Sequence, residues 1–189
     1  MRSNVISKKG SILIWSSNIW NFADGLLGPL FAVFSQKIGG NVLDIASAWG
    51  TYLIVTGVFV IIVGIFSDRL PKLPILFTGY LLTAFFTFCY LLVHTPMQLF
   101  LVQAGIGFSL ALSNPTYFAL LGRFTSGNER DGTMWGWADG RDKIATGLAI
   151  FVGGLIVSAT SFKILFIVMG CLQLVACLYL ARLFYVRRE

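Results

Sequence analysis

Six apolar stretches of membrane-spanning length set the strongest limit on what this chain of 189 residues can fold into. An α-helix needs about 20 mostly apolar residues to cross the hydrocarbon layer of a membrane. The chain is 57% hydrophobic and only 12% charged, which is too apolar for a soluble domain. Because lipid offers no hydrogen-bond partners to the backbone, the spanning segments must be helices that satisfy their own polar groups.

The sequence therefore predicts an all-α integral membrane protein. A single six-helix transmembrane domain is expected to cover residues 1–189. Its predicted spans are about residues 12–34, 45–66, 73–93, 97–121, 135–158 and 162–184.

The positive charges are unevenly distributed over the segments that join these stretches. With the N-terminus placed inside, 12 of the 14 Lys and Arg residues lie on the inner side, and only Lys37 and Lys163 lie outside. Membrane proteins keep most positive residues of their short loops in the cytoplasm. We therefore expect both termini to be cytoplasmic and the protein to be a multi-pass protein of the plasma (inner) membrane. The net charge of +6 reflects this asymmetry, so no nucleic acid is expected as a partner.

Polar residues recur along the first and fourth stretches. They are Ser17, Asn18, Asn21, Asp24 and Gly28 in the first stretch, and Gln103, Gly107, Asn114 and Tyr117 in the fourth. Most of them recur at helical spacing and so share one face of each helix. Polar groups inside a membrane usually face a bundle interior or a wet cavity. The alternative is that the amides only join neighbouring helices.

Asp24 is the most unusual of these residues. It lies near the middle of its stretch with no basic residue within helical reach. Desolvation disfavours the charged form of a carboxyl group there. A mid-membrane acid that takes up and releases a proton is a candidate coupling site. A structural, permanently protonated Asp is the alternative.

The first and fourth stretches also show a faint internal repeat. Asn18 and Gln103 are both the seventh residue counted from Ile12 and Met97, and Pro29 and Pro115 are the eighteenth and nineteenth. The two stretches cross in opposite directions. The pattern predicts a 3+3 inverted repeat with a binding site near the midplane, as is typical of secondary transporters.

Other classes of membrane protein find no support in the sequence. The sole histidine, His94, lies in an outer turn, without the Ser-His pair or paired acids of an intramembrane protease. No Gly-x-x-x-x-Gly-Lys-Ser/Thr loop for ATP is present. We expect no enzymatic activity, no cofactor and no metal site. Cys89, Cys171 and Cys177 all lie within spans, which favours a packing role.

The loop between the second and third stretches is Gly64-Ile65-Phe66-Ser67-Asp68-Arg69-Leu70-Pro71-Lys72. Its Gly64, Asp68, Arg69 and Lys72 resemble the Gly-x-x-x-Asp-Arg/Lys-x-Gly-x-Arg/Lys-Arg/Lys loop of the major facilitator superfamily, with Lys72 one place early. Partial matches to other segments of that family are Gly105-Ile106-Gly107, Glu129-Arg130-Asp131-Gly132 and Gly153-Gly154. The chain thus resembles one six-helix half of such a transporter.

This resemblance implies a secondary active transporter of a small organic molecule that works by alternating access. We expect it to be proton-coupled, by symport or antiport. Since the family is built from two six-helix halves, the resemblance implies a parallel homodimer with one cavity on its two-fold axis. The substrate- and proton-binding residues it implies are Asn18, Asn21, Asp24, Gln103, Asn114 and Tyr117, with Trp15 as a further candidate.

The loop residues are expected to act as a conformational latch. These are Gly64, Asp68, Arg69 and Lys72, and their alternative role is only to set the topology. Two alternatives to the transporter homodimer also stay open. One is a non-transporting scaffold or accessory subunit, in which Asp24 and the amides would tolerate substitution. The other is one half of a hetero-complex transporter.

Overall fold

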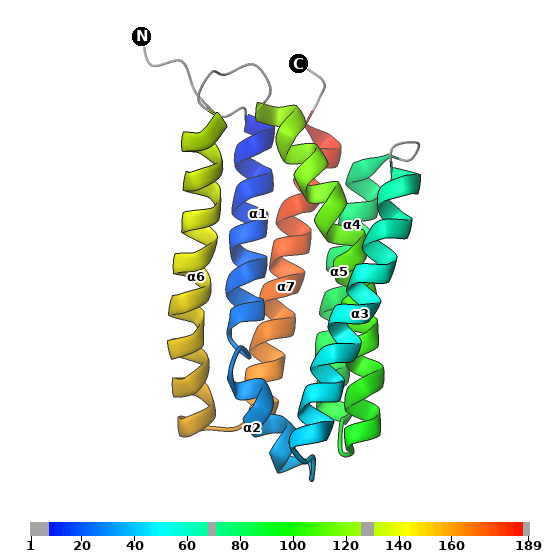
Figure 1. Ribbon diagram of the computed structural model, residues 1–189. Coiled ribbons are helices and arrows are strands. Elements are labelled where there is room, and N and C mark those ends of the chain that lie inside the picture. The colour runs from blue at the N-terminus through cyan, green and yellow to red at the C-terminus, as the bar shows by residue number, and fades with distance from the viewer. Residues whose placement is uncertain (1–7, 68–70, 126–130, 187–189) are drawn as a thin grey trace.

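The computed structural model is a bundle of helices that run side by side (Figure 1). It describes residues 8–67, 71–125 and 131–186, and these ranges contain no strand. The helices are α1 (Lys8–Gly25), α2 (Leu30–Lys37), α3 (Val42–Ser67), α4 (Lys72–Cys89), the short 3-10 helix η1 (Tyr90–Leu92), α5 (Pro96–Thr125), α6 (Asp131–Ala159) and α7 (Phe162–Tyr185). The start of α1 and the end of α7 lie at the same end of the bundle.

Within the described residues, five helices are long and apolar enough to cross a membrane. They cover Val42–Ile65, Lys72–Leu92, Pro96–Phe124, Asp139–Ala159 and Phe162–Tyr185. These are the second to sixth of the predicted spans, so the prediction of an all-α protein with membrane-spanning helices is confirmed. The first predicted span is different.

The single helix expected over residues 12–34 is divided into α1 and α2. Gly28 adopts a φ of +27°, in the left-handed region that favours glycine, and Pro29 supplies no N–H to continue the helix. Across the break, the Leu27 N–H donates to the Asp24 carbonyl over 3.3 Å and the Phe31 N–H donates to the Gly28 carbonyl over 3.2 Å. The break therefore leaves Asp24 in the last turn of α1.

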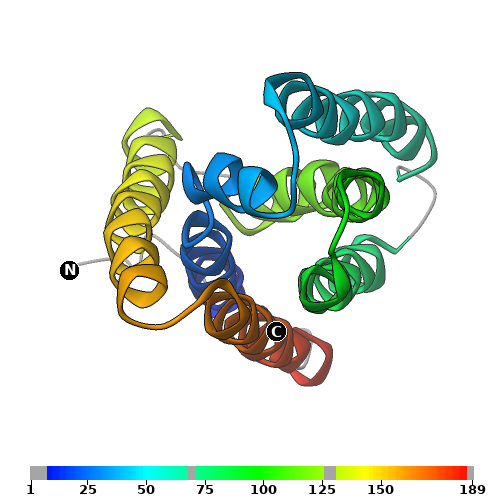
Figure 2. The same ribbon diagram turned by 90° about the horizontal axis from the view of Figure 1, so that it is seen from below.

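Apart from the short helices α2 and η1, the helices form two groups that lie side by side (Figure 2). In one group α1 packs against α6 and α7, and in the other α5 packs against α3 and α4. The groups join where α4 packs against α7 and where α1 approaches α5.

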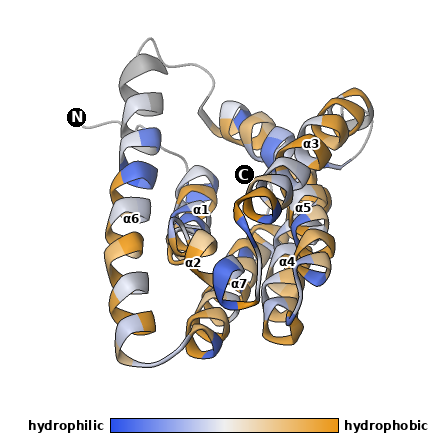
Figure 3. Ribbon diagram, turned by 60° about the horizontal axis from the view of Figure 1, so that its bottom comes forward, coloured by the Kyte–Doolittle hydropathy of each residue, from blue (hydrophilic) through white to orange (hydrophobic). Residues whose placement is uncertain are grey.

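The flanking helices α3 and α6 carry many apolar residues (Figure 3), and several of these side chains are exposed. Ile54 and Ile61 of α3 are 68% and 67% exposed, and Phe151 and Leu155 of α6 are 75% and 68% exposed. Exposed apolar surface of this extent suits contact with lipid or with another protein chain.

Glycines allow the outer helices to approach the central ones closely. A Cβ on Gly153 of α6 would meet the Leu26 carbonyl group at the break, with the carbonyl carbon 2.9 Å away. A Cβ on Gly107 of α5 would lie 2.6 Å from the Tyr52 carbonyl oxygen of α3. Helix α6 therefore packs directly on the break in the first span.

Candidate functional site

A cavity of about 240 Å³ opens between α1, α4, α5 and α6, and we refer to it as the polar cavity. Helix α1 contributes Ser17 and Asn21, α5 contributes Asn114 and Tyr117, and α6 contributes Asp142. Segments far apart in the sequence thus bring amide, hydroxyl and carboxyl groups together inside an otherwise apolar bundle.

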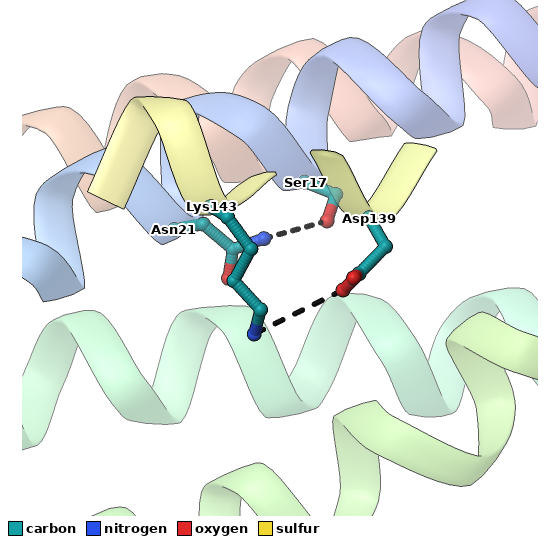
Figure 4. Close-up of polar contacts among 4 residues, drawn as sticks. All are labelled: Ser17, Asn21, Asp139 and Lys143. Atoms are coloured by element: carbon teal, nitrogen blue, oxygen red, sulfur yellow. Dashed lines mark hydrogen bonds and ion pairs between the residues drawn. The ribbon is translucent and has the colours of Figure 1, made fainter. Parts of the chain in front are cut away.

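Short contacts hold the side chains of the polar cavity in place (Figure 4). The Asn21 Nδ2 donates to Ser17 Oγ over 3.2 Å, and Asn21 also lies within hydrogen-bonding reach of Asp142. At the rim, the Lys143 Nζ lies 3.8 Å from Asp139 Oδ1, with both side chains more than two-thirds exposed. An exposed pair of this kind adds little to stability. Its effect is to place both signs of charge beside the amides, where a polar ligand can meet them.

A second cavity of about 140 Å³ adjoins the first, and we refer to it as the Asp24 cavity. It is lined by Asp24 at the break, by Trp49 and Tyr52 of α3, and by Gln103 of α5. Thr146 of α6 lines both cavities, so they meet at that residue. Among the described residues that line it, none is basic. The carboxyl group of Asp24 therefore faces aromatic and amide groups without a cation beside it.

Asp24 and Gln103 differ in how freely their side chains can be approached. Gln103 is 3% exposed, and its Oε1 accepts a hydrogen bond from the Tyr90 hydroxyl over 3.0 Å. This buried pair fixes the amide in one orientation. Asp24 has an exposed side chain. A ligand or a proton carrier can therefore reach Asp24 more readily than Gln103.

The structure brings most of the predicted site residues into these two cavities. Asn21, Asn114 and Tyr117 line the polar cavity, and Asp24 and Gln103 line the Asp24 cavity.

Asn18 lies apart from the other predicted site residues. It lines a separate groove with Trp15, whose ring centroid is 4.8 Å from the Arg141 guanidinium carbon. The Asn18 Oδ1 is buried without a hydrogen-bond partner among the described residues. One residue of helix turns a side chain by about 100°, so Asn18 cannot share the face of Ser17.

The predicted latch falls partly outside the described residues. Gly64 lies in the last turn of α3 and Lys72 is the first residue of α4. Asp68 and Arg69 lie in the range 68–70, which is outside the described residues. The latch therefore stays a prediction.

Sequence reasoning missed the acidic residues that α6 contributes to the polar cavity. Asp139, Asp142 and Thr146 recur at intervals of three and four residues, which places them on one helical face. This spacing was the available signal, but charges at the start of a span are also expected from topology alone. Within the described residues, no group of three or more His, Cys, Asp or Glu side chains could hold a metal ion.

With the cavities placed, comparison with known proteins assigns the family. Residues 14–189 match the model of the Major Facilitator Superfamily. The chain belongs to this superfamily. It is 24% identical over 175 residues to an uncharacterized MFS-type transporter of Methanocaldococcus jannaschii, an alignment that covers 90% of this chain and 44% of that protein. The chain thus spans less than half the length of this relative. The resemblance inferred from the loop motif is confirmed.

Proposed function

We propose that the chain forms a secondary active transporter of a small organic molecule, coupled to protons and working by alternating access. One observation carries this proposal. Carboxyl, amide and hydroxyl groups from α1, α5 and α6 converge on two adjoining cavities of a membrane bundle. Such groups are costly inside a membrane and mark substrate and proton pathways.

The packing of the helices supports an inverted repeat of three plus three spans. In such a repeat the first span corresponds to the fourth, the second to the fifth and the third to the sixth. The packing of α1 on α6 and α7 then corresponds to the packing of α5 on α3 and α4, and both are observed. The contacts follow the same rule, since a Cβ on Gly25 would touch Thr146 and one on Gly107 would touch Thr56. Thr56 and Thr146 are each the twelfth residue of their predicted spans, whereas Gly25 is the fourteenth and Gly107 the eleventh of theirs, so the correspondence holds for the helix pairs and not residue by residue. Repeats of this kind allow one group of helices to rock against another around a fixed site.

A second six-helix unit would complete the site. The polar cavity, about 240 Å³, is smaller than the roughly 300–1,000 Å³ of a typical small-molecule site. Two copies facing each other across a two-fold axis would bring the joint volume into that range. We therefore propose a parallel homodimer. Asp68 and Arg69 would act as the latch by reaching the partner's α6.

Asp24 is proposed as the coupling acid. It lies at the break of the first span, in a cavity whose described lining carries no cation, so a change in its protonation alters the charge of the site. Lys37 follows the break at the end of α2, and Lys163 is the second residue of α7. We propose that this end of the bundle is outside and that the termini are cytoplasmic in the plasma membrane.

The chemistry of the cavities favours sugars or polyols as the substrate class. Asn21 and Asn114 offer donors and acceptors, and the half-buried aromatic ring of Tyr117 lines the same cavity. This combination binds hydroxyl groups and the apolar face of a sugar ring. A lipophilic cation is the alternative, because Asp24 lies among aromatic rings.

Uptake into proteoliposomes tests the proposal. The full chain is reconstituted, a pH gradient is imposed, and labelled sugars, polyols and lipophilic cations are screened. We expect gradient-driven uptake of at least one compound, and its loss in Asn114→Leu, which removes the amide from the polar cavity. A matched control is Asn41→Ser, at a hydrogen-bonded loop position outside both cavities. If the folded protein transports none of these compounds, the proposal of a transporter homodimer fails. The alternatives are then a non-transporting scaffold or accessory subunit, or one half of a hetero-complex transporter.

A further inference from the structure

A third cavity, of about 250 Å³, lies at the end of the bundle opposite the start of α1, and we refer to it as the outer basic pocket. It forms where the end of α2, the helix η1 and the start of α7 meet. Lys37, His94 and Lys163 come from these three separate regions and all line it. Lys37 and Lys163 are the two basic residues that the charge distribution places on the outer side. The fold thus gathers both into one pocket.

Three polar side chains of the pocket, those of Lys37, Lys163 and Ser161, can donate hydrogen bonds to an anion. Lys37 and Lys163 are exposed, and no carboxylate occurs among the described residues that line the pocket. The His94 Nδ1 lies 2.8 Å from the Leu92 carbonyl oxygen, which can only accept. The ring can therefore donate from Nδ1 to this carbonyl group. The Ser161 hydroxyl adds a further donor at the N-cap of α7.

The floor of the pocket is aromatic. Phe34 packs edge-on to Phe166 with centroids 4.8 Å apart, and Tyr90 stacks on Phe166 at 4.8 Å. The Lys37 ammonium group lies 5.5 Å from the centroid of Phe162. Because Phe162 itself lines the pocket, this contact favours a position of the Lys37 ammonium group beside the pocket. The pocket therefore combines a basic rim with an apolar base.

We propose that the outer basic pocket binds a phosphate group, that of an anionic phospholipid headgroup in the outer leaflet. The apolar neighbours of the rim favour a lipid as the source of the phosphate. Leu92 is 71% exposed and Ile164 is 44% exposed beside the pocket, so acyl chains can continue along the surface. This inference concerns a site distinct from the transport cavities and does not depend on transport.

Native mass spectrometry of the full chain in detergent tests the proposal directly. The protein is titrated with phosphatidylglycerol and, separately, with phosphatidylcholine of the same acyl chains. We expect tighter binding of phosphatidylglycerol. Each lysine near an anionic headgroup contributes about fivefold in affinity, so Lys37→Gln/Lys163→Gln should weaken phosphatidylglycerol binding about 25-fold. Phosphatidylcholine binding should change much less.

Two control variants separate the pocket from general charge. Lys8→Gln/Arg123→Gln removes the same charge from exposed residues at the other end of the bundle and should bind phosphatidylglycerol as the wild type does. Lys37→Arg/Lys163→Arg keeps the charge and should retain binding. Equal affinity for phosphatidylglycerol in the wild type and in Lys37→Gln/Lys163→Gln would overturn the proposal. An equal loss of affinity for phosphatidylglycerol in Lys8→Gln/Arg123→Gln would overturn it as well.

Inorganic phosphate distinguishes the two sources of the anion. If the pocket takes a lipid headgroup, phosphatidylglycerol should bind much more tightly than inorganic phosphate, and its binding should depend on Lys37 and Lys163. Inorganic phosphate that binds through Lys37 and Lys163, while phosphatidylglycerol binding is independent of them, would overturn the lipid source and assign the pocket to a soluble phosphate.

Discussion

The contact between Gly153 and the break at Leu26 predicts that a single methyl group on α6 destabilises the bundle. In Gly153→Ala, the new Cβ would meet the Leu26 carbonyl oxygen, with the carbonyl carbon at 2.9 Å and the Cα at 3.1 Å. Ordinary contacts begin near 3.4 Å, so α6 and the break must separate by at least 0.5 Å. These atoms belong to the backbone and cannot rotate away as a flexible side chain would.

The expected magnitude follows from two opposing effects. Overpacking a tight interface costs about 1–3 kcal/mol, and a backbone obstacle places this site at the upper end. Replacing Gly by Ala within a helix also stabilises the helix by about 1 kcal/mol, because Ala has the higher helix propensity. We therefore expect Gly153→Ala to lower the free energy of unfolding by about 2 kcal/mol. For a chain of this length, that corresponds to a fall of roughly 4–8 °C in Tm.

The neighbouring glycine provides a matched control. A Cβ on Gly154 would have nothing within 4 Å, so Gly154→Ala should keep or slightly raise Tm. Both variants are purified in the same detergent, and unfolding is followed by loss of the monodisperse gel-filtration peak on heating. If Gly153→Ala is as stable as Gly154→Ala, α6 does not pack on the break as described.

Two further substitutions test the packing around the Asp24 cavity by the same thermal assay. Tyr90→Phe removes the donor to Gln103 Oε1 and leaves a buried acceptor unpaired, which should cost about 1–3 kcal/mol; Tyr185→Phe, at an 88% exposed position, should cost nothing measurable. Gly28→Ala places a side chain at a φ of +27° and should cost about 1–2 kcal/mol. Gly50→Ala, in the open interior of α3, should not lower Tm, and an equal fall in Gly28→Ala and Gly50→Ala would contradict a strained turn.

The length of the apolar runs was enough to predict most of the helices. The expected spans over 45–66, 97–121 and 162–184 differ from α3, α5 and α7 by at most a few residues, because the membrane fixes how long an apolar helix must be. The break in the first span was harder to predict. Gly28 and Pro29 are visible helix breakers, but the same pair could have produced only a kink. In the structure, the backbone at the break lies against Gly153 of α6. A contact between such distant segments cannot be read from sequence spacing.

The candidate site was predictable where helical spacing alone decides the face. Ser17, Asn21 and Asp24 recur at intervals of four and three residues and do line the two adjoining cavities. Asn18 was included as an amide of the same span and as the repeat counterpart of Gln103, and the turn of the helix carries it to another groove. Asp142 joins Asn21 only through the packing of α6 on α1, which is a contact between distant segments.

The central claim is that Asp24 couples substrate movement to protons, and one comparison tests it most directly. Accumulation driven by a pH gradient and substrate exchange without a gradient are measured in proteoliposomes of the wild type and of Asp24→Asn. Asp44→Asn serves as the control, because the Asp44 carboxylate accepts a hydrogen bond from the Asn41 N–H at the start of α3 and lies outside both cavities. We predict that Asp24→Asn loses accumulation but keeps exchange, while Asp44→Asn keeps both. Undiminished accumulation in Asp24→Asn would contradict the account.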